Sequence, residues 1–404
     1  MKILILTHRA PFPQNSGYPI VVGNTIRGLI NSGHQVSLFS LNPQKQKGNH
    51  SHTTDELINQ INYYCHNIDT SISLKHAFMS LFNSKLYTVD RYYNAEFERL
   101  LIKEVQSGNY DIIQFEGLFV TPYLPAISKV TKAKLIYRAH HIEYLVWERL
   151  AKQKNDPVKK LYLRMIAKRI KQYELKQFEL FNAIAVFTNQ DKQTIQQHSG
   201  AAVPVEILPV GLDLMRYQPD YRKTEFPSLF FLGAMDWMPN REGIEWFLDH
   251  FAAELTDGDL RARFYVAGND IPERFDDYEV VGKIYIHGEV DDALEFVNTK
   301  AIMIVPLLSG GGMRVKIVEG MAMQKCIIST SLGAEGINYQ QGENIIIANT
   351  PQEFYRAIKR CITDENYCKR IGLNARKLVE EQHDTHKITE RLVTFYQHTL
   401  SASY

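Results

Sequence analysis

The chain has 404 residues, of which 45% are hydrophobic and 23% are charged, and its formal net charge at pH 7 is +1. This composition is typical of a globular protein, and the length predicts two domains of about 150–200 residues each. The near-zero net charge excludes the strongly basic field of many nucleic-acid-binding proteins, so we expect no nucleic acid partner.

The apolar runs and the cysteines indicate whether the protein crosses a membrane and in which redox compartment it lies. The run Ile3–Leu6 is too short for a signal-peptide core, and the run at 301–308 is far below the roughly 20 residues that span a bilayer. We therefore expect neither a signal peptide nor a transmembrane helix. The four cysteines are Cys65, Cys326, Cys361 and Cys368. They show neither metal-ligand spacing nor the density of a disulfide framework, which favours a reducing, cytoplasmic location.

Short apolar, β-branched runs alternate along the chain with segments long enough for helices. In the first half they are KILILT, QVSLFS, DIIQFEG, KLIYRA, AIAVFT and VEILPV, and in the second half SLFFLGA, RFYVAG, KIYIHGEV, AIMIVPL, CIISTS and NIIIA. Runs that are apolar on both faces are typical of parallel strands covered by helices on both sides. Because the pattern occurs twice, we predict an α/β protein with two Rossmann-like, doubly wound parallel-sheet domains.

The stretch at 209–227 separates the two halves. It contains three prolines and many polar residues without helical or strand periodicity, which indicates a linker. Neither half carries the dinucleotide G-x-G-x-x-G fingerprint or a Walker A motif, so we expect the ligand in a cleft between the domains.

The stretch SGGGMRVKIVEG, Ser309–Gly320, follows one predicted strand and leads into a helical pattern. Backbone N–H groups at such a helix start favour phosphate, and glycines let its oxygens approach. We expect Arg314 in the first turn, where a cation is unfavourable unless an anion is bound, and Lys316 and Glu319 on one helix face. A carboxylate there suits ribose hydroxyls, so the stretch predicts a nucleoside diphosphate site. An ordinary flexible loop with an exposed Lys–Glu pair is the alternative.

Longer motifs resemble one family over nearly the whole chain. They include NSGYP at 15–19, YRAHHIEYLVWERLA at 137–151, FLGAMDWMPNREGIEWFL at 231–248 and VPLLSGGGMRVKIVEG at 305–320. In order and spacing they are similar to the retaining glycosyltransferases of family 4, within glycosyl transferases group 1, which have the GT-B fold. The resemblance implies an acceptor-side domain at 1–208, a donor-side domain at 209–380 facing it across a cleft, and a C-terminal helix at 381–404 that packs back on the first domain.

The resemblance also implies an activity: transfer of a sugar from a nucleoside-diphosphate sugar to a glycan, lipid-linked or small-molecule acceptor, as a hexosyltransferase-type enzyme in polysaccharide biosynthesis. Matched to the family motifs, His140 touches the donor sugar, Arg314 and Lys316 flank the diphosphate, and Glu319 holds the ribose. The remaining donor contacts are main-chain ones, at Gly17, Gly288, Gly311, Gly312 and Met313. Gly311 stands where many relatives carry a second glutamate, which leaves the level of activity open.

Several roles remain open at this point. Glu143, near His140, is a candidate nucleophile or base, and His8 and Arg9 either line an acceptor pocket or belong to a solvated loop. The chain has no D-x-D pair at a strand end, and Asp291–Asp292 fits a helix start better. We therefore expect no metal at the donor site and no cofactor beyond the sugar nucleotide itself.

The segment at 149–176 is strongly basic and carries apolar residues at helical spacing, among them Leu161, Tyr162 and Met165. A basic amphipathic helix can bind an anionic membrane, which would suit a lipid-linked acceptor at the inner face of the membrane. A surface helix whose apolar stripe packs on the first sheet is the alternative.

For the whole chain, a GT-B epimerase acting on a nucleotide sugar and a catalytically silent binding subunit are the rival functions. The sequence names neither the sugar, the base nor the acceptor.

Overall fold

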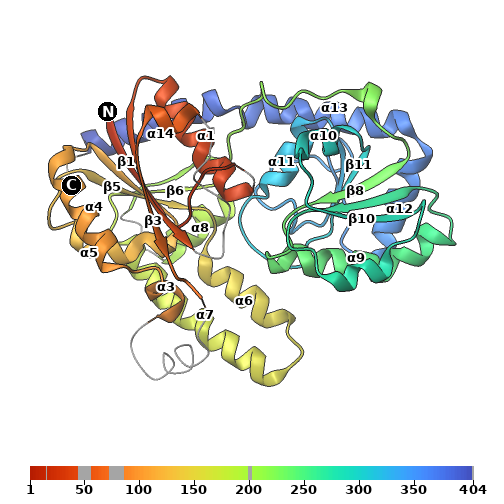
Figure 1. Ribbon diagram of the computed structural model, residues 1–404, viewed down its shortest axis with the longest axis horizontal. Coiled ribbons are helices and arrows are strands. Elements are labelled where there is room, and N and C mark those ends of the chain that lie inside the picture. The colour runs from red at the N-terminus through yellow and green to blue at the C-terminus, as the bar shows by residue number, and fades with distance from the viewer. Residues whose placement is uncertain (15, 44–55, 72–85, 199–202, 403–404) are drawn as a thin grey trace. The chain divides into compact units, whose positions relative to one another are not determined.

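The computed structural model, which describes residues 1–14, 16–43, 56–71, 86–198 and 203–402, divides into two compact units. Unit 1 comprises Met1–Pro209 and Ile388–Tyr404, and unit 2 comprises Val210–Lys387. The boundary expected at 380–381 lies inside helix α13 (Glu365–Gln382), and the division falls after Lys387 instead. Both units have the predicted α/β architecture (Figure 1).

In its described part, unit 1 contains a seven-stranded sheet in the order β3-β2-β1-β4-β5-β6-β7, with every neighbouring pair parallel. Its strands are β1 (Lys2–Thr7), β2 (Gln35–Pro43), β3 (Asn62–Ile68), β4 (Ile112–Glu116), β5 (Lys134–Ala139), β6 (Ala183–Val186) and β7 (Val205–Ile207). Its helices are α1 (Gly17–Asn31), α3 (Tyr87–Asp90), α4 (Ala95–Gly108), α5 (Leu124–Ile127), α6 (Glu143–Gln153), α7 (Pro157–Phe178), α8 (Asn189–His198) and α14 (Thr385–Ser401), with 3₁₀ turns at Glu56–Gln60 and Leu118–Tyr123.

Alternating side chains of β1 enter two separate cores. Leu4 and Leu6 join the cluster on one face of the sheet, whereas Ile3 and Ile5 join the cluster on the other face. This second cluster also contains side chains of α1 and α14, among them Tyr396, whose hydroxyl donates to the buried Gln114. Helix α14 therefore completes the core of unit 1 although it is last in the sequence.

The described part of unit 2 contains a six-stranded parallel sheet in the order β10-β9-β8-β11-β12-β13. The strands are β8 (Ser228–Leu232), β9 (Arg263–Ala267), β10 (Ile284–Gly288), β11 (Ile302–Val305), β12 (Cys326–Ser329) and β13 (Ile346–Ile347). The helices are α9 (Met238–Thr256), α10 (Ala293–Asn298), α11 (Val315–Ala322), α12 (Pro351–Thr363) and α13, with 3₁₀ turns at Tyr221–Lys223 and Glu273–Tyr278. The predicted fold class is confirmed for both units.

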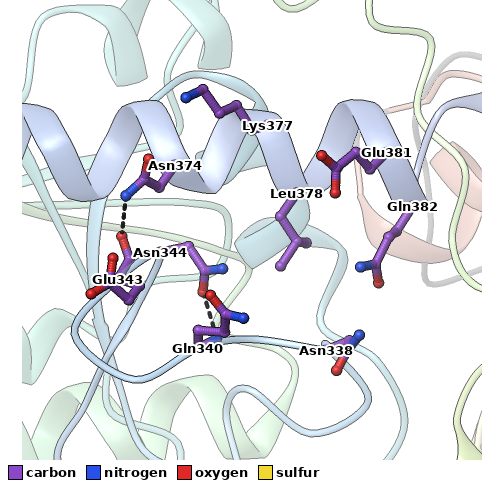
Figure 2. Close-up of a pocket in the computed structure, with 9 residues that line it drawn as sticks. All are labelled: Asn338, Gln340, Glu343, Asn344, Asn374, Lys377, Leu378, Glu381 and Gln382. Carbon is purple, nitrogen blue, oxygen red and sulfur yellow. Dashed lines mark hydrogen bonds between the residues drawn. The ribbon is translucent and has the colours of Figure 1, made fainter.

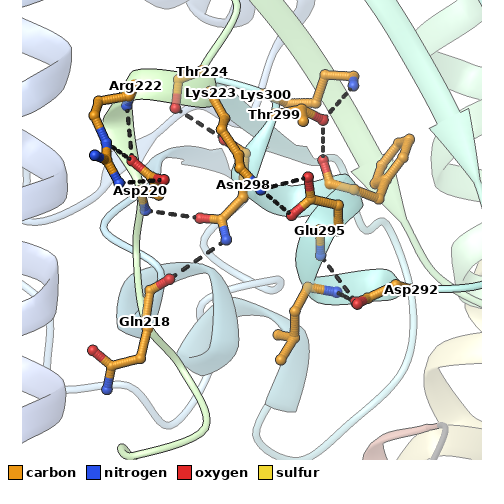
Figure 3. Close-up of polar contacts among 12 residues, drawn as sticks. Gln218, Asp220, Arg222, Lys223, Thr224, Asp292, Glu295, Asn298, Thr299 and Lys300 are labelled. Atoms are coloured by element: carbon orange, nitrogen blue, oxygen red, sulfur yellow. Dashed lines mark hydrogen bonds and ion pairs between the residues drawn. The ribbon is translucent and has the colours of Figure 1, made fainter.

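Polar contacts fix the predicted linker segment to helix α10 (Figure 3). The backbone N–H of Asp220 donates to Asn298 Oδ1 at 3.0 Å, and Lys223 Nζ lies 3.0 Å from Glu295 Oε1. Asp292 caps α10, because its Oδ1 accepts the N–H groups of Leu294 and Glu295 at 2.8 and 3.0 Å. The prediction that Asp291–Asp292 starts a helix is thus confirmed.

The basic segment at 149–176 forms parts of two helices, which separate before Asp156, the N-cap of α7. The helices lie side by side, and the end where they are joined extends away from the sheet (Figure 1). On α7 the buried apolar face is formed by Ile166, Ala167, Ile170 and Phe178. Leu161 and Met165, predicted to belong to an apolar stripe, are 61% and 42% exposed. Within the described ranges, no helix has the length and hydropathy required to cross a bilayer.

Candidate active site

The three-glycine loop connects β11 to α11 in unit 2. Gly310 and Gly312 have φ angles of 104° and 76°, which side-chain-bearing residues rarely adopt, so the loop requires glycine at these positions. Helix α11 begins at Val315, and Arg314 is its N-cap rather than a first-turn residue. The prediction of Arg314 inside the helix is therefore wrong by one position.

Arg314 folds back onto the loop that precedes it. Its Nη1 donates to the carbonyl oxygens of Gly311 and Gly312, the latter at 2.6 Å, and its guanidinium carbon lies 5.3 Å from the centre of the Trp237 ring. Only 5% of the residue is exposed. Arg314 thus fixes the shape of the glycine loop and gives it a positive charge at the same time.

Lys316 points from α11 toward the end of β8. Its Nζ donates to Asn240 Oδ1 at 2.9 Å and lies 4.1 Å from the centre of the Phe231 ring. A Cβ at Gly233 would come within 2.2 Å of this Nζ, so glycine makes room for the ammonium group. Burial, followed by repulsion from Arg314, lowers the pKa of Lys316 to about 7.

Glu319 lies one turn further along the same face of α11. Its Oε1 accepts a hydrogen bond from the Tyr217 hydroxyl at 2.8 Å, and no hydrogen bond from the described residues reaches its Oε2. Burial raises the pKa of Glu319, against the opposing effects of the Tyr217 hydrogen bond and the Lys316 charge. The structure therefore brings Arg314, Lys316 and Glu319 together, as the sequence predicts.

Gly288, one of the predicted donor contacts, and two further glycines of unit 2 lie at or just beyond the carboxyl ends of neighbouring strands. Gly288 ends β10 with a φ of 68°, and its carbonyl oxygen accepts the N–H of Gly268 at 2.8 Å. A Cβ on Gly268 would lie only 2.0 Å from the carbonyl oxygen of Gly233. Glycines thus let the backbone ends of β8, β9 and β10 pack closely. Gly17, in unit 1, is the first residue of α1; Asn15 of the same motif lies outside the described residues.

His140 follows β5 in unit 1 and forms a pair with a buried carboxylate at the end of β4. Its Nε2 lies 2.6 Å from Glu116 Oε2, and the Glu116 side chain is fully buried. Burial alone would raise the pKa of Glu116, but the Arg138 guanidinium and His140 hold it below its ordinary value. Burial lowers the pKa of His140 despite the carboxylate. A neutral imidazole beside a carboxylate carries its proton on the facing nitrogen, so Nδ1 is left as the basic atom.

Aromatic rings surround this pair. The Tyr18 ring centre lies 4.6 Å from that of His140 and 4.6 Å from that of His8, and the Tyr18 hydroxyl donates to the Glu116 carbonyl oxygen at 3.3 Å. His8 also contacts the rings of Tyr92 and Phe119. Burial and the proximity of His140 lower the pKa of His8 to about 3, so it is neutral at pH 7. His8 is half-buried among aromatic rings rather than fully solvated, and its place in an acceptor pocket stays a prediction.

Glu143 does not hydrogen bond to His140 among the described contacts. Its Oε2 lies 2.6 Å from His141 Nε2, and its Oε1 accepts the Trp147 Nε1–H at 3.1 Å. Its backbone N–H donates to Glu174 of α7 at 2.9 Å, which ties α6 to α7. These contacts give Glu143 a structural environment, which argues against its predicted candidacy as the nucleophile or base.

Sequence reasoning missed three residues of these sites: Glu116, Tyr217 and Asn240. Each lies on an element other than the one that carries its partner. Asn240 belongs to the quoted motif at 231–248, whereas Tyr217 lies in the segment read as a linker and Glu116 in a run read only as a strand. The available signal was a residue that differs from its neighbours, such as the carboxylate of Glu116 within a mostly apolar strand.

Residues 226–364 match the family model described as Glycosyl transferases group 1. Unit 2 contains a glycosyl transferases group 1 domain. The whole chain is 23% identical over 399 residues to an uncharacterised 44.6 kDa protein in the cps region of Klebsiella pneumoniae, covering 96% of this chain and 97% of that protein. The predicted resemblance to group 1 is confirmed for residues 226–364; the assignment to family 4 stays a prediction.

Solved structures of low sequence identity share the fold. Sucrose-phosphate synthase from Thermosynechococcus elongatus matches with a TM-score of 0.73 at 14% identity, covering 100% of both chains. Anabaena HepE in complex with UDP-glucose matches at 0.66 and 14%, covering 98% of this chain and 100% of that one. TarM of S. aureus matches at 0.69 and 9%, covering 98% of each. These matches show that the whole chain shares the fold of these structures.

A separate polar pocket of about 340 Å³ lies in unit 2 between the 338–344 loop and α13 (Figure 2). None of the predicted site residues lines it. Two of its amides are engaged in holding the loop: Asn374 Nδ2 donates to the Glu343 carbonyl oxygen at 3.1 Å, and Asn344 Oδ1 accepts the Gln340 N–H at 2.8 Å. We therefore assign these contacts to loop anchoring rather than to the donor.

Proposed function

We propose that the protein is a retaining glycosyltransferase of the GT-B type, which transfers a hexose from a nucleoside-diphosphate sugar to a glycan, lipid-linked or small-molecule acceptor. The observation that carries the proposal is the grouping of Arg314, Lys316 and Glu319 beside the glycine loop of the group 1 domain. Anabaena HepE, which shares the fold, has been crystallised with UDP-glucose, which supports a sugar nucleotide as donor.

In this proposal the diphosphate lies at the N-terminal end of α11. The N–H groups of Gly311, Gly312 and Met313 and the ammonium of Lys316 stabilise the charge that the diphosphate gains as the sugar departs. Arg314 holds these N–H groups in place and adds its own charge. The free Oε2 of Glu319 accepts a ribose hydroxyl, and main chain near Gly288 contacts the base.

The His140–Glu116 pair serves the transferred sugar in the same proposal. Glu116 fixes the tautomer in which Nδ1 of His140 is unprotonated, so Nδ1 accepts a hydrogen bond from a sugar hydroxyl. No side chain around His140 is assigned as a covalent nucleophile, because Glu143 is held by His141 and Trp147. We infer attack of the acceptor on the face that the diphosphate leaves, with a phosphate oxygen taking the acceptor's proton.

Ligand-induced stabilisation tests the proposal directly. Thermal unfolding is followed with UDP, GDP, ADP and CDP, and one nucleotide at 100 times its Kd should add about 2.7 kcal/mol of stability. The Glu319→Ala variant should lose this shift. If no nucleoside diphosphate stabilises the chain, the donor assignment is wrong.

Turnover then separates the rival functions. A transferase releases nucleoside diphosphate faster when an acceptor is added, whereas an epimerase converts the donor sugar alone and a silent subunit does neither. Activity should disappear in both His140→Ala and Glu319→Ala. We also propose that the diphosphate is neutralised without a divalent cation, so the rate after EDTA treatment should not rise on addition of Mg²⁺ or Mn²⁺.

We further propose that α7 mediates peripheral contact with an anionic membrane at its cytoplasmic face. Val158, Leu161 and Met165 are 75%, 61% and 42% exposed, and they lie among basic residues of the same helix: Lys159, Lys160, Arg164 and Lys168. Such a surface can insert apolar side chains while its cations bind lipid phosphates.

Co-sedimentation with phosphatidylglycerol vesicles tests this surface at low and high salt. Binding should fall at high salt and be lost in Leu161→Asp, but persist in Val281→Asp, a matched change at a 95% exposed residue of unit 2. Equal loss in both variants, or no binding by the unaltered chain, would contradict the proposal.

A further inference from the structure

Three of the four cysteines converge in the core of unit 2 although their spacing in the sequence gives no sign of it. Cys326 begins β12, Cys361 lies near the end of α12 and Cys368 lies in the first turns of α13. All three are at most 5% exposed, and their Sγ atoms lie within 4.8 Å of one another. The Sγ atoms of Cys326 and Cys361 are 3.8 Å apart.

These separations match those of sulfur ligands around one metal ion. Two thiolates bound to Zn²⁺ at about 2.3 Å with a tetrahedral angle lie about 3.8 Å apart. Buried cysteines commonly serve as small apolar residues. Packing alone, however, does not require three thiols from three different elements to direct their sulfur atoms at a common point.

A small pocket borders two of the three cysteines. It has a volume of about 30 Å³, enough for a water molecule, and Cys326 and Cys368 both line it. Lys325 lines the same pocket and is only 3% exposed. Its Nζ donates to the Asn298 carbonyl oxygen at 3.1 Å, and no ion pair to it is found within the described ranges.

The charges of the thiols and of Lys325 are complementary. A divalent ion with three thiolates has a net charge of −1, which a protonated Lys325 in the same pocket would balance.

We propose that Cys326, Cys361 and Cys368 form a buried trithiolate site for one thiophilic metal ion, with Zn²⁺ as its occupant and water in the pocket as the fourth ligand. On binding, the three thiols release their protons to solvent and each bonds to the metal as a thiolate. The ion joins β12, α12 and α13, so it stabilises the fold of unit 2. This inference does not depend on glycosyl transfer.

Cadmium titration of the reduced, chelator-stripped full chain tests the site, because thiolate-to-Cd²⁺ charge transfer produces an ultraviolet band. One equivalent of Cd²⁺ should saturate the band. Zn²⁺ should displace the Cd²⁺ and so remove the band. Mutation of a residue that hydrogen bonds to a metal ligand typically weakens metal binding 10- to 100-fold. Removal of a ligand in Cys361→Ala should therefore weaken binding by more than about 100-fold.

The fourth cysteine offers a matched control. Cys65 is exposed and lies in unit 1, so Cys65→Ser should keep the band and the stoichiometry of one. Circular dichroism checks that each variant is folded; should Cys361→Ala not fold, Cys368→Ser at the edge of the pocket replaces it. The proposal is overturned if the unaltered chain binds no Cd²⁺, or if the band persists in the core variants.

Discussion

Replacement of Lys316 by methionine should increase the stability of the free protein and weaken its binding to nucleotide. The ammonium of Lys316 is desolvated on folding, and its pKa falls from an ordinary value of 10.5 to about 7. Between these two values the unfolded chain binds more protons than the folded chain, so stability contributed by this position rises as pH increases from about 7 to 10. Methionine has a similar length and no charge to desolvate.

The effect on nucleotide binding has the opposite sign. A hydrogen bond to a charged group contributes about 1.5–3 kcal/mol, so Lys316→Met should raise Kd by about 10- to 150-fold. At a nucleotide concentration of 100 times the original Kd, the stabilisation should fall from about 2.7 kcal/mol to between about 1.3 and 0.3 kcal/mol. In the unaltered chain, Kd should rise as pH increases above about 7, because the neutral amine must take up a proton to hold the phosphate.

Thermal unfolding with and without nucleotide between pH 6 and 9 measures both effects. Lys377→Met, a change at another lysine of unit 2 that lines the separate polar pocket, should alter neither. The reasoning is refuted if Lys316→Met lowers the melting temperature of the free protein, or if its nucleotide shift equals that of the unaltered chain at every pH.

Three further changes probe the remaining contacts. Tyr217→Phe removes the donor to Glu319 and should raise the pKa of that carboxyl further. As the pH is lowered, nucleotide binding, measured by calorimetry, should therefore begin to weaken at a higher pH than in the unaltered chain. An unchanged pH profile would contradict the contact. Glu116→Gln should lower kcat by about 10- to 150-fold, which corresponds to the loss of one charge-assisted hydrogen bond. It should also lower the pH at which His140 is protonated, because the Glu116 carboxylate raises the pKa of His140. A fall in kcat without a pH shift would indicate a purely structural role for Glu116. Gly310→Ala forces a φ of 104° on alanine and brings its Cβ to 3.1 Å from the Trp237 ring, so urea unfolding should show a loss of about 1–3 kcal/mol; no loss would mean that the loop relaxes freely.

The sequence predicted the parts of the molecule that depend on local pattern. Apolar runs predicted every described strand except β3, whose sequence NYYCHNI is largely polar and only partly buried. The order of the motifs predicted the group 1 domain, because strand burial and loop glycines leave short-range signals. Side-chain direction was less accessible. The sequence places Arg314 beside a diphosphate, and the structure shows that its guanidinium also contacts the carbonyl oxygens of its own loop and lies near Trp237, the N-cap of α9.

Contacts between distant elements were not predictable from spacing alone. Glu116 and His140 are 24 residues apart and meet because β4 and β5 are paired in register, so both strands end at the same edge of the sheet. The cysteines of unit 2 meet in the same way through the packing of α12 and α13 on β12. These pairs can be predicted from a single sequence only when the topology of the sheet is also known.

The candidate residues of both units obey one rule, since nearly all lie just beyond the carboxyl ends of parallel strands. The two units use that position differently. In unit 1, strand ends carry side chains that fix one another, with Glu116 held by Arg138 and Gln114 and in turn orienting His140. In unit 2, glycines follow β8 and β9 and end β10, Lys316 lies beside Gly233, and Arg314 contacts the glycine loop. Directional hydrogen bonding to hydroxyl groups requires the first arrangement, and neutralisation of a bulky diphosphate requires the second. This difference supports assignment of sugar recognition to His140 and of diphosphate binding to the glycine loop.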